Sequence, residues 1–309
     1  MSGNNADRIE RRAMVIGAIG NLSMAVIAWF TYWYSNSEAV LLDGNYSLIV
    51  FIGMVVALSI ARIKTRRTET FPLGQFFYES LYSFIKGLMI LGVIIMAVAT
   101  SVVRILLYVR GSTENIPALN PEPILVYASA MVLLSFFLSG YYRLANRRIG
   151  GQSSILWTDG KASFVDGVLS LGILVGVFFL RNANAEGGAD FVPYLADSII
   201  TLVLSVSLVS KPIQIIRESV IELALGKLQN EQEYQACETA IREVCEPEYR
   251  LSSVHMSKTG SRYLAVAILQ PADGGDVVSL DTVRLRRQEI LERLSPRFPH
   301  LMVELLPRL

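Results

Sequence analysis

Cysteine is scarce in this chain, and neither sign of charge is in excess. Cys237 and Cys245 are the only cysteines in 309 residues, so we expect two buried, unpaired thiols rather than a disulfide framework or a thiolate metal site. Lys and Arg number 28 and Asp and Glu number 27, which leaves a net charge of +1. A nucleic-acid-binding protein needs a surplus of basic side chains to neutralise phosphates, so the composition argues against that class.

Apolar residues are abundant instead. They make up 52% of the chain against 18% charged residues, and the mean hydropathy is +0.43, which is typical of a membrane protein. The charges are unevenly placed, because 26 of the 55 charged residues lie in the last 93. The sequence therefore predicts that the first two thirds lie in lipid and that the last third is a small water-soluble domain.

Six segments are long and apolar enough to cross a bilayer, which takes about 20 residues each. Between Ala13 and Ala61 only Glu38 and Asp43 are charged, and a polar break at 35–37 divides this stretch into two spans. Four more are expected at about 78–108, 123–146, 153–180 and 191–215. The first apolar run is too long for a removable signal peptide, and a second follows at once. We therefore expect a multi-pass, all-α membrane domain with six transmembrane helices.

Basic residues near the span ends predict the orientation, because Lys and Arg are retained on the cytoplasmic side. Ten of them lie before the first span, after the second and after the fourth, whereas the opposite loops carry only Arg110 and Arg181. Both termini are therefore expected in the cytoplasm. The ten are Arg8, Arg11, Arg12, Arg62, Lys64, Arg66, Arg67, Arg143, Arg147 and Arg148.

The periodicity changes near residue 229. The pattern then predicts, in order, a helix at 230–244, strands at 251–257 and 262–270, a helix at 281–294 and a strand at 301–306. This order is typical of a compact α+β unit. The expected domains are a cytoplasmic tail at 1–12, a transmembrane domain at 13–215, a linker at 216–228 and a cytoplasmic α+β domain at 229–309.

Two aspartates lie inside predicted spans, where a carboxylate costs about 3 kcal/mol or more and persists only if it functions or faces a wet cavity. Asp43 lies about one turn into the second span and Asp166 near the middle of the fifth. Helical spacing places further oxygen-bearing side chains on the same faces: Ser47 beside Asp43, and Asp159, Ser163 and Ser170 beside Asp166. Converging oxygens of this kind make a cation site. The alternative is that each Asp bonds a Ser or a backbone group between packed helices.

Ionisable residues in the third span have a simpler interpretation. Glu79 and Lys86 share a helix face, and we expect a structural ion pair, either between them or with a neighbouring helix.

Enzymatic functions find little support. Two intramembrane aspartates could share a proton as in an aspartyl protease, but neither Asp43 nor Asp166 follows the Gly-x-Gly-Asp pattern. There is no glycine-rich phosphate loop and no nucleophile elbow, so neither ATP-driven pumping nor serine hydrolysis is indicated. We expect neither an enzyme nor a bound cofactor.

With these features the chain resembles the cation diffusion facilitator family. Residues 71–80 (FPLGQFFYES) look like the Pro-x-Gly and Glu-Ser signature that opens the family's third span. Asp43 and Asp166 fall where the family places metal-binding aspartates, and Asp197 resembles its acidic position at the start of the sixth span. The resemblance implies a homodimeric divalent-metal/proton antiporter, with both termini inside and a C-terminal ferredoxin-like or metallochaperone-like domain.

The departures from the family pattern concern the metal. In the family's usual zinc site each of the two helices gives two ligands four residues apart, but here the partner of Asp43 is Ser47 and that of Asp166 is Ala162. No histidine precedes His255, so an imidazole site within the membrane is excluded. The remaining oxygens favour Mg²⁺, Mn²⁺, Fe²⁺ or a partly hydrated ion over Zn²⁺. His255 and His300 are expected to be structural.

We therefore expect an atypical member of this family. It would be a secondary active transporter in a lipid bilayer that exports a divalent cation (Mn, Fe, Mg, Co or Zn) in exchange for protons by alternating access. A single short chain without a targeting signal suits a bacterial inner membrane, which is the expected location. The expected metal site is Asp43, Asp166, Ser47, Ser163 and Asp159. The alternative is a non-transporting scaffold or sensor homologue that has lost the site.

Overall fold

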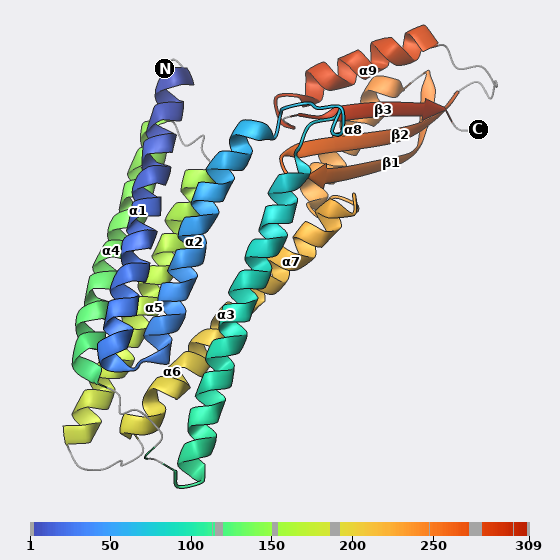
Figure 1. Cartoon of the computed structure of the whole chain (residues 1–309). Helices are drawn as coiled ribbons and strands as arrows, with labels where there is room; N and C mark the ends of the chain where they lie inside the picture. Colours follow the sequence, from blue (N-terminus) through green and yellow to red (C-terminus); the bar gives the residue numbers. More distant parts are fainter. Residues whose placement is uncertain are drawn as a thin grey trace. The chain divides into compact units, whose positions relative to one another are not determined.

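The computed structural model describes residues 3–112, 114, 120–149, 154–185, 192–246, 248–271, 280–298 and 300–307. Within this part, six helical segments are long and apolar enough to cross a membrane, which confirms the predicted spans. The helices that form them are α1 (Gly3–Ser35), α2 (Glu38–Ile63), α3 (Phe77–Val109), α4 (Pro121–Arg148), α5 (Ser154–Ala185), α6 (Val192–Leu208) and α7 (Ser210–Leu223) (Figure 1).

The sixth span runs farther than the sequence suggested. It covers Leu195–Leu223 and so includes α7, whereas we expected it to end near residue 215 and a linker to begin there. Pro212 is accommodated because it stands in the first turn of α7, where a missing N–H is tolerated. Apolar residues at 213, 215, 216 and 220 keep a helical pattern beyond it.

The chain folds as two compact units. The first comprises Met1–Val56 and Leu88–Ile213, and the second comprises Ala57–Gly87 and Gln214–Leu309. The long helices α2 and α3 each contribute to both units, so the division does not coincide with the membrane spans.

Close packing in the first unit depends on two glycines of α1. Gly17 lies against the Tyr142 side chain of α4, and a Cβ at Gly20 would be 2.9 Å from Leu138 of the same helix. The two helices are therefore antiparallel, which brings Arg11 and Arg12 of α1 to the same end as Arg147 and Arg148 of α4. All four of these side chains are exposed.

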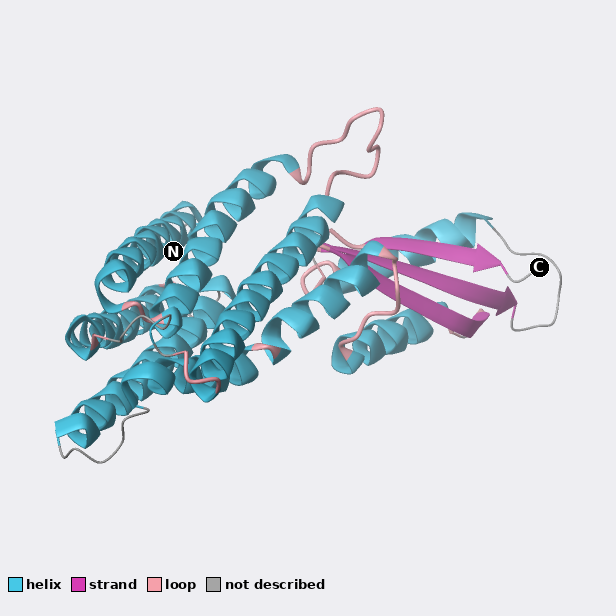
Figure 2. Cartoon of the chain, turned by 60° about the horizontal axis from the view of Figure 1, so that its bottom comes forward, coloured by secondary structure: helices cyan, strands magenta, loops and turns pink. Residues whose placement is uncertain are grey.

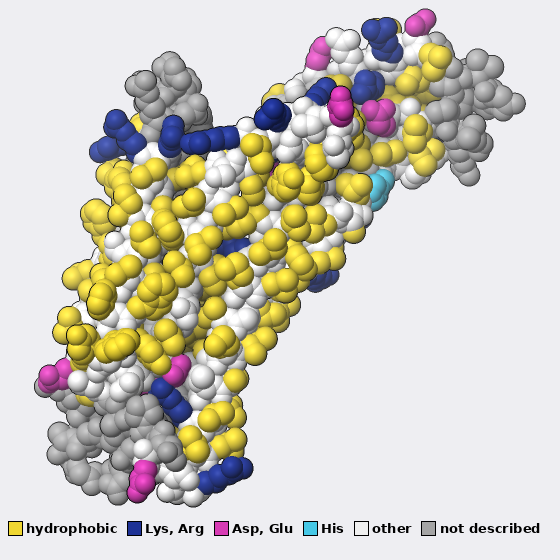
Figure 3. All heavy atoms as spheres, viewed as in Figure 1, with side chains coloured by type: hydrophobic (Ala, Val, Ile, Leu, Met, Phe, Trp, Pro, Cys, Tyr) yellow, Lys and Arg dark blue, Asp and Glu magenta, His cyan; other side chains and the backbone are white. Residues whose placement is uncertain are grey.

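Apolar side chains also cover the outside of these helices. On the face drawn in Figure 3, hydrophobic side chains spread over the helices with few charges between them. Phe30, Trp33, Phe137 and Val206 are among the large hydrophobic residues more than 60% exposed in the isolated chain. Water would not support such a surface, but lipid would, so it fits membrane-spanning helices.

The second unit contains the predicted α+β domain. Its elements are α8 (Glu231–Cys245), β1 (Tyr249–Thr259), β2 (Arg262–Pro271), α9 (Leu280–Leu294) and β3 (Met302–Pro307), within one or two residues of most expected boundaries (Figure 2). The sheet order is β1-β2-β3, with β1 antiparallel and β3 parallel to β2. The predicted order of helices and strands is confirmed.

Both cysteines lie in the core of this domain, between α8, α9 and the sheet. Cys237 and Cys245 are fully buried and free, as expected, and they pack with Ile241, Met256 and Ile290. Burial raises the pKa of each thiol to about 11, so both are protonated and unreactive at neutral pH.

Candidate metal-binding site

The first unit contains a small cavity of about 20 Å³ that two helices supply with carboxylates. Asp43 of α2 and Asp166 of α5 both line it, and each is half-buried. The hydroxyl-bearing residues Tyr46 and Ser170 also line it, and its apolar wall includes Leu204 of α6. A cavity of this size holds about one water molecule, so it also has room for a single bare cation.

A tyrosine from a third helix holds Asp43 in place. The Tyr127 hydroxyl of α4 donates a hydrogen bond of 2.5 Å to Asp43 Oδ2, and the tyrosine side chain is only 2% exposed. A carboxylate oxygen accepts more than one interaction, so Asp43 keeps acceptor capacity for a cation. A hydrogen bond to a ligating carboxylate is the usual means of fixing its orientation.

The structure brings together only part of the predicted ligand set. Asp43 and Asp166 line one cavity, whereas Ser47, Ser163 and Asp159 are not among its lining residues. Ser47 is 5% exposed, and Ser163 and Asp159 are half-buried on α5.

Three hydroxyl groups were missing from the predicted ligand set. Helical spacing had placed Ser170 on the polar stripe of the fifth span, one turn after Asp166, but not among the ligands. Tyr46 lies three residues after Asp43, so the same spacing could have identified it. Tyr127 is 84 residues from Asp43, and no local pattern connects them.

The donor set determines which ions suit the cavity. All of its polar lining side chains present oxygen, which matches hard cations such as Mg²⁺ and Mn²⁺ better than Zn²⁺. In the part of the chain that the structure describes, no three His, Cys, Asp or Glu side chains are grouped to hold a metal ion. A cation here would therefore be bound by two carboxylates together with hydroxyls or water.

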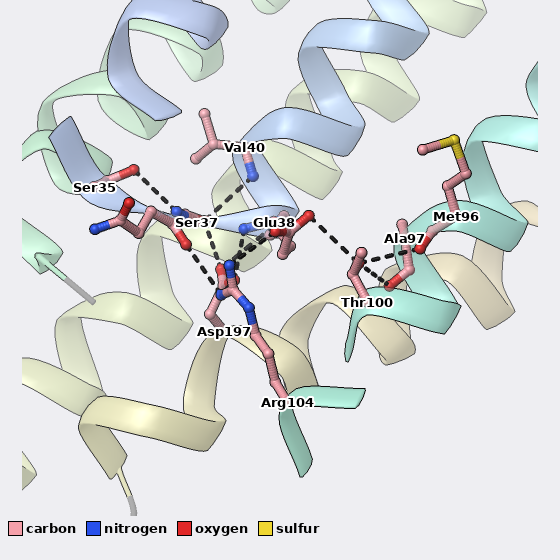
Figure 4. A network of polar contacts seen from close by, with 11 residues as sticks. Ser35, Ser37, Glu38, Val40, Met96, Ala97, Thr100, Arg104 and Asp197 are labelled. Atoms are coloured by element: carbon pink, nitrogen blue, oxygen red, sulfur yellow. Dashed lines mark hydrogen bonds and ion pairs between the residues drawn. The ribbon is translucent and has the colours of Figure 1, made fainter. Parts of the chain in front are cut away.

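A second buried polar cluster lies where α1 ends and α2 begins (Figure 4). Asp197 of α6, only 3% exposed, accepts hydrogen bonds from the Ser37 hydroxyl at 2.5 Å and from the backbone N–H of Glu38 at 2.6 Å. Arg104 of α3 lies 2.8 Å from Glu38 and 3.4 Å from Asp197. Asp197 thus caps the N-terminus of α2 from a distant helix, and Arg104 balances the charge of both acids.

The remaining ionisable residues of interest make structural contacts in the second unit. Glu79 pairs with Lys64 at 2.9 Å and also accepts a hydrogen bond from the backbone N–H of Ser261. His255 is hydrogen-bonded to the Leu225 carbonyl at 3.1 Å, and the ring of His300 lies 5.0 Å from that of Phe76.

Six spans with two carboxylates at one internal cavity define a multi-pass membrane protein with a polar site among its helices. The family model for the cation efflux transmembrane domain matches residues 14–224, a region that reaches across all six spans and ends just after α7. The chain belongs to this family, the cation diffusion facilitators that its motifs resemble. The activity at family level is metal cation transport. A search of curated proteins finds no match.

Proposed function

We propose that the protein exports a divalent metal cation in exchange for protons and that the ion passes through the cavity lined by Asp43 and Asp166. The observation that supports this is the placement of two carboxylates, from two different helices, on one cavity inside the apolar part of the chain. Such a pair is costly in a membrane unless it binds a cation or a proton.

The residues around the cavity have complementary roles in this proposal. Asp43 and Asp166 provide the negative charge, Ser170 and Tyr46 provide neutral oxygens, and Tyr127 orients Asp43. Mn²⁺, Mg²⁺ and Fe²⁺ suit these ligands best, and Co²⁺ and Zn²⁺ remain candidates because geometry and availability also determine selectivity. Ser47, Ser163 and Asp159 remain predicted ligands that would act through water or after a helix movement.

Proton exchange follows from the chemistry of a carboxylate. A carboxylate binds either the metal ion or a proton, so the release of one favours the uptake of the other. If the two facing states of the transporter differ in their affinity for metal and proton, rocking between them couples opposite flows.

The setting in the membrane is part of the same proposal. The arginines that meet at one end of α1 and α4 are expected on the cytoplasmic side. Because six spans follow the N-terminus, the α+β domain is expected on the same side. A homodimer in a bacterial inner membrane is the expected form.

Metal uptake into proteoliposomes under a proton gradient tests the proposal. The double variant Asp43→Asn, Asp166→Asn should lose transport, and normal flux through it would refute the site. Two serines provide a matched pair. Ser170→Ala should reduce transport because Ser170 lines the cavity. Ser129→Ala should leave transport close to that of the wild type, because Ser129 is an exposed residue of α4 that bonds the Leu125 carbonyl of its own helix and does not line the cavity. If the protein is instead a non-transporting scaffold, the wild-type protein itself should give no metal flux in this assay.

A further inference from the structure

A pocket in the second unit has an unusual concentration of positive charge. Its volume is about 540 Å³, within the range typical of small-ligand sites. Arg67, Arg262, Arg287 and His300 line it, and the described lining residues include no acid. These four side chains come from the segment between α2 and α3, the start of β2, helix α9 and the segment before β3.

Neutral backbone groups hold two of the guanidinium groups. Arg262 Nη1 donates to the Leu73 carbonyl at 2.5 Å, and Arg287 Nε donates to the Val303 carbonyl at 2.7 Å. Both guanidinium groups retain further N–H donors, since each has five. The two side chains are therefore positioned without their charge being neutralised by these contacts.

Negative charge near the pocket does not balance the arginines. Arg287 also donates to Glu304 at 3.2 Å, but this carboxylate is shared with solvent, since 45% of its side chain is exposed. Arg67 has no hydrogen-bond or ion-pair partner among the described residues. Arg67 and Arg262 line the same pocket, and burial together with the charge of Arg67 lowers the pKa of Arg262. Such an arrangement attracts an anion and repels a metal ion.

We propose that this pocket binds a phosphate group. The planar guanidinium groups of arginine form paired hydrogen bonds with phosphate and carboxylate oxygens better than with other common anions. Of these two anions, a phosphate carries more negative charge, so it balances three arginines better than one carboxylate does. The Thr65 hydroxyl on the same pocket adds a neutral donor. A phospholipid headgroup and a soluble phosphorylated compound present the same chemistry, so the source of the phosphate has to be measured.

Direct binding to the purified full-length chain tests the proposal. Isothermal titration with inorganic phosphate in detergent measures the soluble source, and retention of phosphatidylglycerol from mixed phosphatidylcholine nanodiscs, measured by mass spectrometry, tests the lipid source. Arg67→Gln and Arg287→Gln should each weaken the binding of whichever probe is bound by about tenfold, the usual effect of losing hydrogen bonds to a charged group.

Arg286→Gln is the matched control, because Arg286 is adjacent in α9 but pairs with Glu248 and Glu289 and does not line the pocket. It should bind as the wild type does. Arg67 is exposed and forms no described bond, so its loss should leave the circular dichroism spectrum unchanged. If neither probe binds, or if both test variants bind like the wild type, the proposal is wrong.

Discussion

Replacing Tyr127 by Phe removes one oxygen atom beside the cavity and leaves the aromatic ring in place. The hydroxyl that is lost donates the 2.5 Å hydrogen bond to Asp43, and the side chain is almost fully buried, so water cannot readily replace the donor. Asp43 would remain at the cavity with its orientation less well fixed. We expect metal binding to weaken while the fold is retained.

The size of the effect follows from the type of bond. A hydrogen bond to a charged group contributes about 1.5–3 kcal/mol, and about 1.4 kcal/mol corresponds to a tenfold change in an equilibrium constant. Metal affinity should therefore fall by about 10-fold to 100-fold, which is also the usual effect of removing an outer-shell partner of a metal ligand.

Titration of Mn²⁺ into the purified protein measures this affinity, and proteoliposome uptake shows whether transport follows it. Tyr142→Phe is the matched control, since Tyr142 is a buried tyrosine of the same helix whose hydroxyl has no hydrogen-bond partner among the described residues. It should bind Mn²⁺ like the wild type. An unchanged affinity in Tyr127→Phe, or an equal loss in both variants, would contradict the assigned role of Tyr127.

Three further predictions concern stability, measured by unfolding in detergent. Arg104→Gln should destabilise the protein by about 3–5 kcal/mol, because two buried carboxylates lose their cation. Gly260→Ala should cost at least about 1 kcal/mol, since Gly260 has φ +57° and a Cβ there would lie 2.5 Å from the Phe76 carbonyl. Stability should also fall as the pH rises from about 9 towards 11, because the folded chain keeps the protons of Cys237 and Cys245, with pKa values of about 11, after the unfolded chain has lost them.

Each of these predictions has its own control. Arg110→Gln, at an exposed position just after α3, should change stability by less than about 0.5 kcal/mol. Gly92→Ala lies in α3 with open space around its Cβ and should be neutral or stabilising by up to about 1 kcal/mol. A variant with both cysteines replaced by Ala should lack the thiol contribution to the pH dependence. If a control changes as much as its test variant, the corresponding contact does not explain the effect.

Much of the fold could be predicted because its main signals are local. Long apolar runs mark the spans, and the change to alternating residues after 250 marks the strands, since burial on one face repeats with the period of each element. The end of the sixth span was harder to locate, because α7 keeps one apolar face while its other face carries Lys211, Arg217 and Glu218. The point near residue 215 at which charged residues become frequent is therefore not the point at which the helix ends.

The candidate site was predictable only in part. Asp43 and Asp166 stand out because a charge in an apolar run is rare. Helical spacing placed Ser170 beside Asp166, and the same spacing could have identified Tyr46, which the prediction missed. The bond from Tyr127 to Asp43 depends on which helices pack side by side, and one sequence does not specify that. The same holds for Asp197, whose contacts with residues 37–39 span about 160 positions along the chain.

The Asp197 cap has a consequence for how the helices can move. Its carboxylate accepts hydrogen bonds from backbone N–H groups that begin α2, at 2.6 Å from Glu38 and 3.4 Å from Ala39, and these groups have no carbonyl of their own helix to bond. If α6 moved away from the start of α2, these N–H groups and the Asp197 carboxylate would be left without hydrogen-bond partners in apolar surroundings, which is unfavourable. At this end of the unit, the two helices should therefore travel as one rigid pair during any transport cycle, unless water enters to take over the broken bonds.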